Sequence, residues 1–183
     1  TGVLATGLAI ANLVALAADA QVVIRDDTGT QIGMEAISLP ALGHTSFMLF
    51  EQYPVTVGKR GAIEFQTPPD GRISVLGLRA NGPALTTVPV LADVGAGGGS
   101  ITHMLFDGGW TQSFTVVNTG VASAAATLAF FDESGAPLLT PLSLPQTGET
   151  LSSTSLTRAL APGASLIVQT VGQASRPVVV EYR

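Results

Sequence analysis

Two acidic turns contain the residues of this chain whose types and spacing are most suited to catalysis or metal binding. They read Asp-Asp-Thr-Gly at 26–29 and Asp-Glu-Ser-Gly at 132–135. Paired carboxylates can share a proton in acid–base catalysis, or can supply part of the oxygen shell that a calcium ion needs. The same side chains also bond the backbone N–H groups of a tight turn, in which the glycine takes a positive φ. A solvated turn is the simpler prediction, and the weak calcium candidates are Asp26, Asp27, Asp132 and Glu133.

The triplet Asp27-Thr28-Gly29 matches the Asp-Thr-Gly motif of aspartic proteases. Those enzymes need two such aspartates that share one proton. The second turn has Glu133-Ser134-Gly135 in its place, and hairpin turns produce such triplets freely. The sequence also contains no nucleophile–base–acid set, no phosphate-binding loop and no Gly-x-Ser-x-Gly motif. We therefore expect a protein that is not an enzyme and that uses no cofactor.

Histidines and aromatic residues are scattered along the chain. A metal site needs histidines clustered with carboxylates, and nothing in the spacing brings His44 and His103 together. Sugar-binding modules present several aromatic rings on one face, whereas Tyr53, Trp110 and Tyr182 lie far apart. Trp110, after two glycines, is expected to plug the boundary between two units instead.

Composition limits the classes of protein that fit. The chain has 183 residues, of which 46% are hydrophobic and only 11% charged, so it can bury a core beneath a surface poor in charge. The net charge is −5 without a basic run, which argues against nucleic-acid binding. There is no cysteine, so neither a disulfide frame nor a cysteine-ligated metal exists. Many glycines and prolines suit short strands joined by turns.

The first eighteen residues are uncharged and raise the question of an apolar helix. A signal peptide would need a basic start, and a membrane-spanning or pilin-like helix would need about 20 apolar residues. Asn12 interrupts the run and Asp19 ends it. A repeat decides the question, because residues 7–12 (GLAIAN) align with 113–118 (SFTVVN), which is rich in β-branched residues. We expect a strand at 7–12 and no membrane insertion.

That repeat continues without a gap at a spacing of 106 residues. Asn12 falls on Asn118, Asp26 on Asp132 and Gly29 on Gly135, while apolar positions fall on apolar positions. Further matches are drawn between 38–45 (SLPALGHT) and 143–150 (SLPQTGET), between 59–67 and 161–170, and between 72–79 and 176–183. They predict a second copy of about six strands that ends at the last residue.

The segment between the copies predicts the domain boundaries. Residues 85–91 read as a trailing strand of the first copy, and 101–106 (ITHMLF) as a leading strand of the second. GAGGGS at 95–100 reads as a flexible hinge. We therefore predict a first unit at 1–94, a hinge at 95–100 and a second unit at 101–183.

The fold class expected is all-β, with two tandem antiparallel β-sandwiches of about six to seven strands each. The strands that end in Asn12 or Asn118, the Asp-x-x-Gly hairpins and the Ser-Leu-Pro-x-x-Gly-x-Thr turns resemble tandem immunoglobulin-like repeats of bacterial secreted and surface proteins. The resemblance covers most of the chain but only its architecture, since the Cys…Trp…Cys core of true immunoglobulin domains is missing. It implies a secreted or cell-surface location.

The function expected is a non-catalytic extracellular structural or adhesive module. Because the first copy lacks a leading strand and the second a trailing one, a head-to-tail fibre assembled by strand addition is one form of it, with residues 7–12 as a possible free edge. The expected partners are copies of the chain or neighbouring repeats. Alternatives are a carbohydrate- or calcium-dependent binding module, and a pilin-like subunit with an N-terminal helix. The assembly candidates are Leu8, Ile10, Leu85, Val88, Val90, Ile101, Met104 and Phe106.

Overall fold

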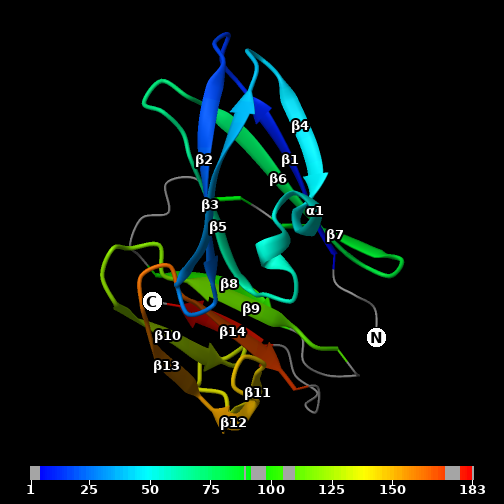
Figure 1. Cartoon of the computed structure of the whole chain (residues 1–183). Coiled ribbons are helices and arrows are strands. Elements are labelled where there is room, and N and C mark those ends of the chain that lie inside the picture. Colours follow the sequence, from blue (N-terminus) through cyan, green and yellow to red (C-terminus); the bar gives the residue numbers. More distant parts are fainter. Residues whose placement is uncertain (1–4, 89, 92–97, 105–109, 172–177, 183) are drawn as a thin grey trace. The chain divides into compact units, whose positions relative to one another are not determined.

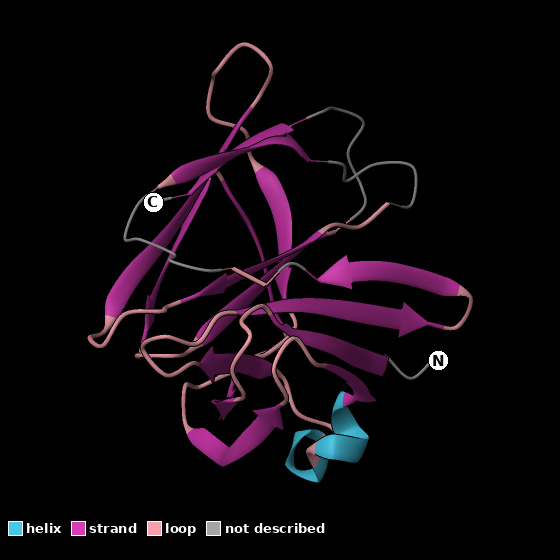
Figure 2. Ribbon diagram, turned by 90° about the horizontal axis from the view of Figure 1, so that it is seen from above, coloured by secondary structure: helices cyan, strands magenta, loops and turns pink. Residues whose placement is uncertain are grey.

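The protein is all-β and built from antiparallel sheets (Figures 1 and 2). A computed structural model describes residues 5–88, 90–91, 98–104, 110–171 and 178–182. Contacts within the chain group residues 1–26 and 30–94 into a first unit, and residues 27–29 and 95–183 into a second. The predicted hinge at 95–100 overlaps a strand, because β8 begins at Gly99, and residues 95–97 lie outside the described part.

The first unit contains two sheets. One has the strand order β4-β1-β6-β7 and the other β3-β2-β5, with all pairs antiparallel. β2 begins with buried Ala18 and Ala20 that alternate with exposed polar residues, and it continues with three successive buried residues, 22–24. The strands are β1 (Ala5–Asn12), β2 (Ala18–Asp26), β3 (Gln31–Leu39), β4 (His44–Met48), β5 (Gly61–Gln66), β6 (Ile73–Asn81) and β7 (Ala84–Val88).

A short helical segment packs on the core of the first unit. The helices α1 (Leu49–Gln52) and η1 (Pro54–Thr56) flank Tyr53, which is 1% exposed. The Tyr53 ring meets Phe47 edge-on, with ring centroids 5.7 Å apart, and joins Val22 and Ile24 in one apolar cluster. Pro54 suits this break, since proline fits the first position of a helix and donates no ladder hydrogen bond.

The second unit also contains two sheets, with orders β12-β11-β14-β9 and β13-β10-β15-β8. Its core gathers large apolar side chains from both sheets, among them Met104, Phe114, Phe130, Leu142 and Val168. The strands are β8 (Gly99–Met104), β9 (Ser113–Val117), β10 (Ala124–Phe131), β11 (Thr140–Leu144), β12 (Glu149–Ser153), β13 (Ser155–Leu160), β14 (Ser165–Thr170) and β15 (Val178–Tyr182).

Residues 5–12 of the N-terminal apolar run form the strand β1, as the repeat predicts for 7–12, so the expectation of a pilin-like helix there is wrong. β1 ends at Asn12 and is not a free edge, however, because it pairs with β4 on one side and with β6 on the other. No helix in the described ranges is long and apolar enough to cross a membrane.

Strand registers confirm the 106-residue repeat for the first two strands of each unit. Ala11 pairs with His44 in the first unit, and Val117 pairs with Ser165 in the second. Ala18 pairs with Leu39, and Ala124 pairs with Leu160. β1 and β2 therefore correspond to β9 and β10, whereas their partners β4 and β3 correspond to β14 and β13.

The later sequence matches are wrong, because the same registers assign other counterparts. Val22 pairs with Phe65 of β5, and its equivalent Leu128 pairs with Tyr182, so β15 corresponds to β5 rather than to β6. The β11–β12 hairpin is an insertion between β10 and β13. The two Ser-Leu-Pro turns thus differ in use: one connects β3 to β4 in the other sheet, whereas the other closes the β11–β12 hairpin.

Candidate functional site: the edges of the sheets

The acidic turns hold their own hairpins together. Asp132 Oδ1 accepts hydrogen bonds from the backbone N–H groups of Ser134 and Ala136, at 2.9 and 3.0 Å, and from the Ser134 hydroxyl at 2.6 Å. Asp26 Oδ1 accepts from Thr30 N–H at 3.1 Å. Gly29 and Gly135 both have the positive φ that the turn needs, at 88° and 83°. Within the described residues, no three His, Asp or Glu side chains gather as a metal site would require.

The aromatic candidates do not form one surface. Tyr53 is buried, whereas Trp110 is 66% exposed. His44 is exposed on β4. The side chains of His103 and Tyr182 lie outside the described part of the structure.

Two asparagines do the same structural work in the two units. Asn12 donates to the carbonyls of Leu16, Leu39 and Pro40 at 2.8, 3.4 and 3.0 Å. Asn118 donates to the carbonyls of Ala122, Leu160 and Ala161 at 2.9, 3.0 and 3.1 Å. Each asparagine ties the loop after its own strand to a loop of the opposite sheet. The sequence marks both residues as strand ends, but not as ties between loops.

Backbone groups that are free to pair lie along the edges of the sheets. An edge strand has a row of N–H and C=O groups without a neighbour, and natural sheets protect such rows with charged residues, prolines or bulges. Four of the edge strands follow this rule. Each carries one charged residue, namely Glu35 on β3, Glu64 on β5, Glu149 on β12 and Arg158 on β13.

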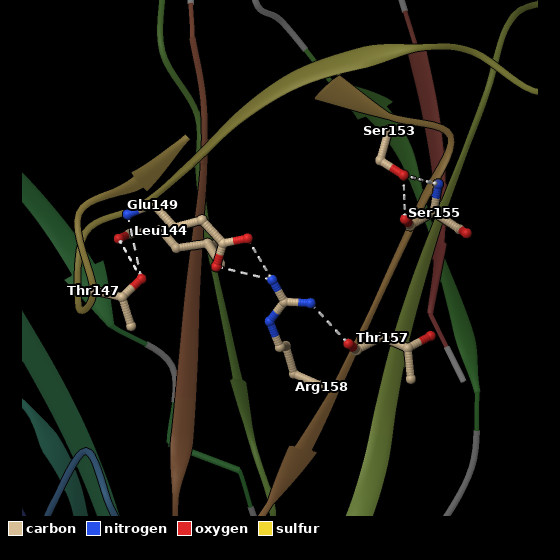
Figure 3. Close-up of polar contacts among 7 residues, drawn as sticks. All are labelled: Leu144, Thr147, Glu149, Ser153, Ser155, Thr157 and Arg158. Carbon is tan, nitrogen blue, oxygen red and sulfur yellow. Dashed lines mark hydrogen bonds and ion pairs between the residues drawn. The ribbon is translucent and has the colours of Figure 1, made fainter. Parts of the chain in front are cut away.

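The charged edges of the second unit are also tied to each other (Figure 3). Arg158 on β13 donates to both carboxylate oxygens of Glu149 on β12, at 2.8 and 2.9 Å. The strands belong to different sheets, so this bidentate pair links the two sheets on one side of the unit. Where β12 leads into β13, the Ser153 hydroxyl donates to the Ser155 carbonyl at 2.5 Å and accepts from the Ser155 N–H at 3.2 Å.

Three other edge strands contain no Asp, Glu, Lys or Arg. They are β7 in the first unit and β8 and β9 in the second. Each pairs with one strand only among the described residues: β7 with β6, β8 with β15 and β9 with β14. The remaining edge, β4, is also uncharged but contacts α1. β7, β8 and β9 are here called the bare edges.

The assembly candidates fall on different kinds of strand. Leu8 and Ile10 are core residues, 8% and 1% exposed, on a strand with two neighbours, which contradicts the expectation of a free edge there. Leu85 and Val88 lie on the bare edge β7, and Leu85 is 68% exposed. The sequence analysis did not identify β9 as an edge, because it placed a leading strand at 101–106 before the second copy. The remaining candidates are Ile101 and Met104 on β8, Val90 beyond β7, and Phe106, which lies outside the described residues.

Comparison with known proteins gives little to place beside this geometry. No protein-family description matches the chain, and no curated protein matches it. One solved structure, titled "Crystal structure of PBSX exported protein XepA", aligns with a TM-score of 0.28 at 11% identity, over 100% of this chain and 76% of that one. So low a likeness carries no argument about fold or function.

Proposed function

We propose that the protein is a non-catalytic structural or adhesive module whose β units join neighbouring molecules by strand addition. The observation that supports the proposal best is the division of the sheet edges into charged strands and bare strands. The extracellular location is part of the proposal and comes from the resemblance to tandem repeats of secreted proteins.

Strand addition suits the bare edges for a physical reason. A new strand gains main-chain hydrogen bonds along the edge, and it meets no charge that must lose its water. β7 has the sequence ALTTV and β9 has SFTVV, both without proline or charge. Leu85 on β7 and Val117 on β9 are 68% and 37% exposed, so an added strand would also cover apolar surface.

The distribution of the bare edges favours an open assembly over a closed pair. β7 belongs to the first unit, whereas β8 and β9 belong to the second. A contact between different surfaces of two molecules leaves one copy of each surface unused, so further molecules can add.

A charge placed on a bare edge tests the proposal. The variant Leu85→Lys protects β7, and the control Met34→Lys adds the same charge to an exposed site, 54% accessible, on β3, which already carries Glu35. We expect light scattering and negative-stain images to show assemblies of the unaltered chain and of Met34→Lys, and smaller particles for Leu85→Lys. A chain that stays monomeric at every concentration would overturn the proposal.

A further inference from the structure

The direction of the backbone groups on β9 follows from the hydrogen bonds at its two ends. Asn118 N–H donates to Ala164 C=O at 2.9 Å, and Thr170 N–H donates to Gln112 C=O at 2.9 Å. Residues 112 and 118 therefore direct backbone groups toward β14. Backbone groups alternate sides along an antiparallel strand, so the odd-numbered residues Thr115 and Val117 direct theirs away from β14.

The first unit shows that a strand can pair on the side that is open in β9. β1, the counterpart of β9, has β4 on the side where β9 has β14, and β6 on its other side. Leu13 N–H donates to Arg72 C=O at 2.8 Å, which extends this ladder beyond the end of β1. On β9 the equivalent side has no neighbour among the described strands. The backbone geometry of β9 thus matches that of β1, which pairs with a strand on each side in the first unit.

The bare edge β7 has matching backbone directions. A two-residue turn with Gly82 at a φ of 57° joins Asn81 to its cross-strand partner Ala84. The pair beside such a turn exchanges both hydrogen bonds, so Ala84, and by alternation Thr86 and Val88, face β6. Leu85 and Thr87 therefore direct their N–H and C=O groups to the open side.

Side-chain faces match as well. On β9 the outward-pairing positions Thr115 and Val117 have exposed side chains, while Phe114 is 7% exposed in the core and Val116 packs against that core. On β7 residues 84–87 are all exposed, including the outward-pairing positions Leu85 and Thr87, and Val88 is partly buried. An antiparallel pairing would therefore place Leu85 and Thr87 on the same side of one continuous sheet as the exposed Thr115 and Val117.

We infer that β7 of one molecule pairs antiparallel with β9 of a second copy of this chain, with Leu85 opposite Val117 and Thr87 opposite Thr115. This inference rests on the proposed function and specifies which two strands form the contact between molecules, here called the joint. The register aligns four residues of each strand, 85–88 of β7 with 114–117 of β9. It sets Leu85 against Val117 on the exposed face, and Val88 against Phe114 on the core face, both of which are favourable cross-strand pairs.

The joint has a direction. It uses the first unit of one molecule and the second unit of the next, so β9 of the first molecule and β7 of the second remain open. Repetition of the same contact gives a head-to-tail chain of molecules.

Cysteine cross-linking tests the register directly, because the chain contains no cysteine. A full-length Leu85→Cys chain is mixed with a full-length Val117→Cys chain and treated with a short thiol-to-thiol reagent. Side chains directly opposite in a sheet have Cβ atoms about 4.5–5.5 Å apart, within reach of such a reagent. The matched control pairs Leu85→Cys with Ser113→Cys, an exposed position on the same strand that is out of register.

We expect at least about tenfold more cross-linked heterodimer for Leu85→Cys with Val117→Cys than for the control, since pairing raises the effective concentration of the two thiols. Equal yields overturn the inference. So do Val117→Cys homodimers in excess of the heterodimer, which would place β9 against β9. Assemblies that remain sensitive to Leu85→Lys without this cross-link would refute the β7–β9 joint alone, whereas a monomeric chain would refute the proposed function too.

Discussion

Asn12 and Asn118 show how single side chains organise both units. Each uses its amide to satisfy three carbonyl oxygens in two separate loops, and its own Oδ1 accepts an N–H two residues later, at 3.1 Å from Val14 and 3.0 Å from Gly120. A buried carbonyl that loses its hydrogen-bond donor without gaining a water molecule lowers the free energy of unfolding. Both copies of the repeat therefore have asparagine at this position, whereas a strand end without these hydrogen bonds would tolerate many residue types.

Replacement of Asn12 by alanine is expected to lower the free energy of unfolding by about 1–3 kcal/mol, because buried carbonyls lose their donor. Asn12 is 2% exposed, whereas Asn118 is more accessible, so Asn118→Ala is expected to cost less. Urea denaturation measures both, with the exposed Ser152→Ala as control. A midpoint of Asn12→Ala equal to that of Ser152→Ala would contradict the assigned role.

Tyr53 is a second residue with a measurable signature. Its hydroxyl is buried without a hydrogen-bond partner in the described structure, and burial, with a smaller contribution from the negative charge of Glu35, raises the pKa of Tyr53 above its usual 10.0. A raised pKa favours the neutral form in the folded state. That stabilising contribution is fully present below the unfolded pKa and is lost as the pH rises through the folded value.

Tyr53→Phe is therefore expected to leave stability at pH 7 unchanged or higher by up to about 1 kcal/mol, since the unpartnered hydroxyl is removed and the ring contact with Phe47 is kept. Above pH 10 the variant should lose less stability than the unaltered chain. Thermal unfolding at pH 7 and at pH 10.5–11 measures the difference. A variant that is clearly destabilised at pH 7 would show that the hydroxyl has a partner.

At the scale of elements, the sequence predicts strands and turns better than their pairing. Residues 7–12 and 20–26 are recognised as strands because alternation and the repeat agree, and Gly29 and Gly135 are recognised because a hairpin needs their positive φ. The match of residues 38–45 with 143–150 misleads because turn chemistry specifies how a chain bends and not which strand it meets next. Only the registers reveal that β11 and β12 are an insertion and that β9 pairs with one strand alone in the described part of the chain.

Proline scanning along β9 is expected to show the alternation of its backbone. Thr115→Pro removes an outward N–H and spares the ladder with β14, so its cost in stability should be small. Val116→Pro removes an inward N–H beside the core and should cost clearly more, because a ladder hydrogen bond with β14 is lost. Chemical denaturation of both variants measures this. Equal costs would contradict the assigned backbone directions.

The ion pair between Arg158 and Glu149 is expected to contribute little to stability. Its side chains are 36% and 43% exposed, and water and salt screen such a pair. Arg158→Ala should lower the free energy of unfolding by less than about 1 kcal/mol, with an effect that shrinks at high salt. A large loss that salt does not change would contradict this account, and denaturation at two ionic strengths decides.

At the scale of the whole molecule, the proposed assembly depends on which sheet edges carry no charge. Two edges of the second unit carry Arg158 and Glu149 and are tied together, whereas its other two edges, β8 and β9, are bare. The first unit carries one more bare edge, β7. Such a molecule has surfaces suited to addition in both units, which is the minimum that open-ended growth requires.

Sedimentation velocity over a range of concentrations tests the central claim most directly, with the unaltered chain beside Thr115→Pro. The unaltered chain is expected to form species larger than the 18.6 kDa monomer, and these species should grow with concentration. Thr115→Pro should keep its fold and sediment as a monomer, because the outward N–H that an added strand needs is gone. An unaltered chain that sediments at 18.6 kDa at every concentration would contradict strand addition as its function.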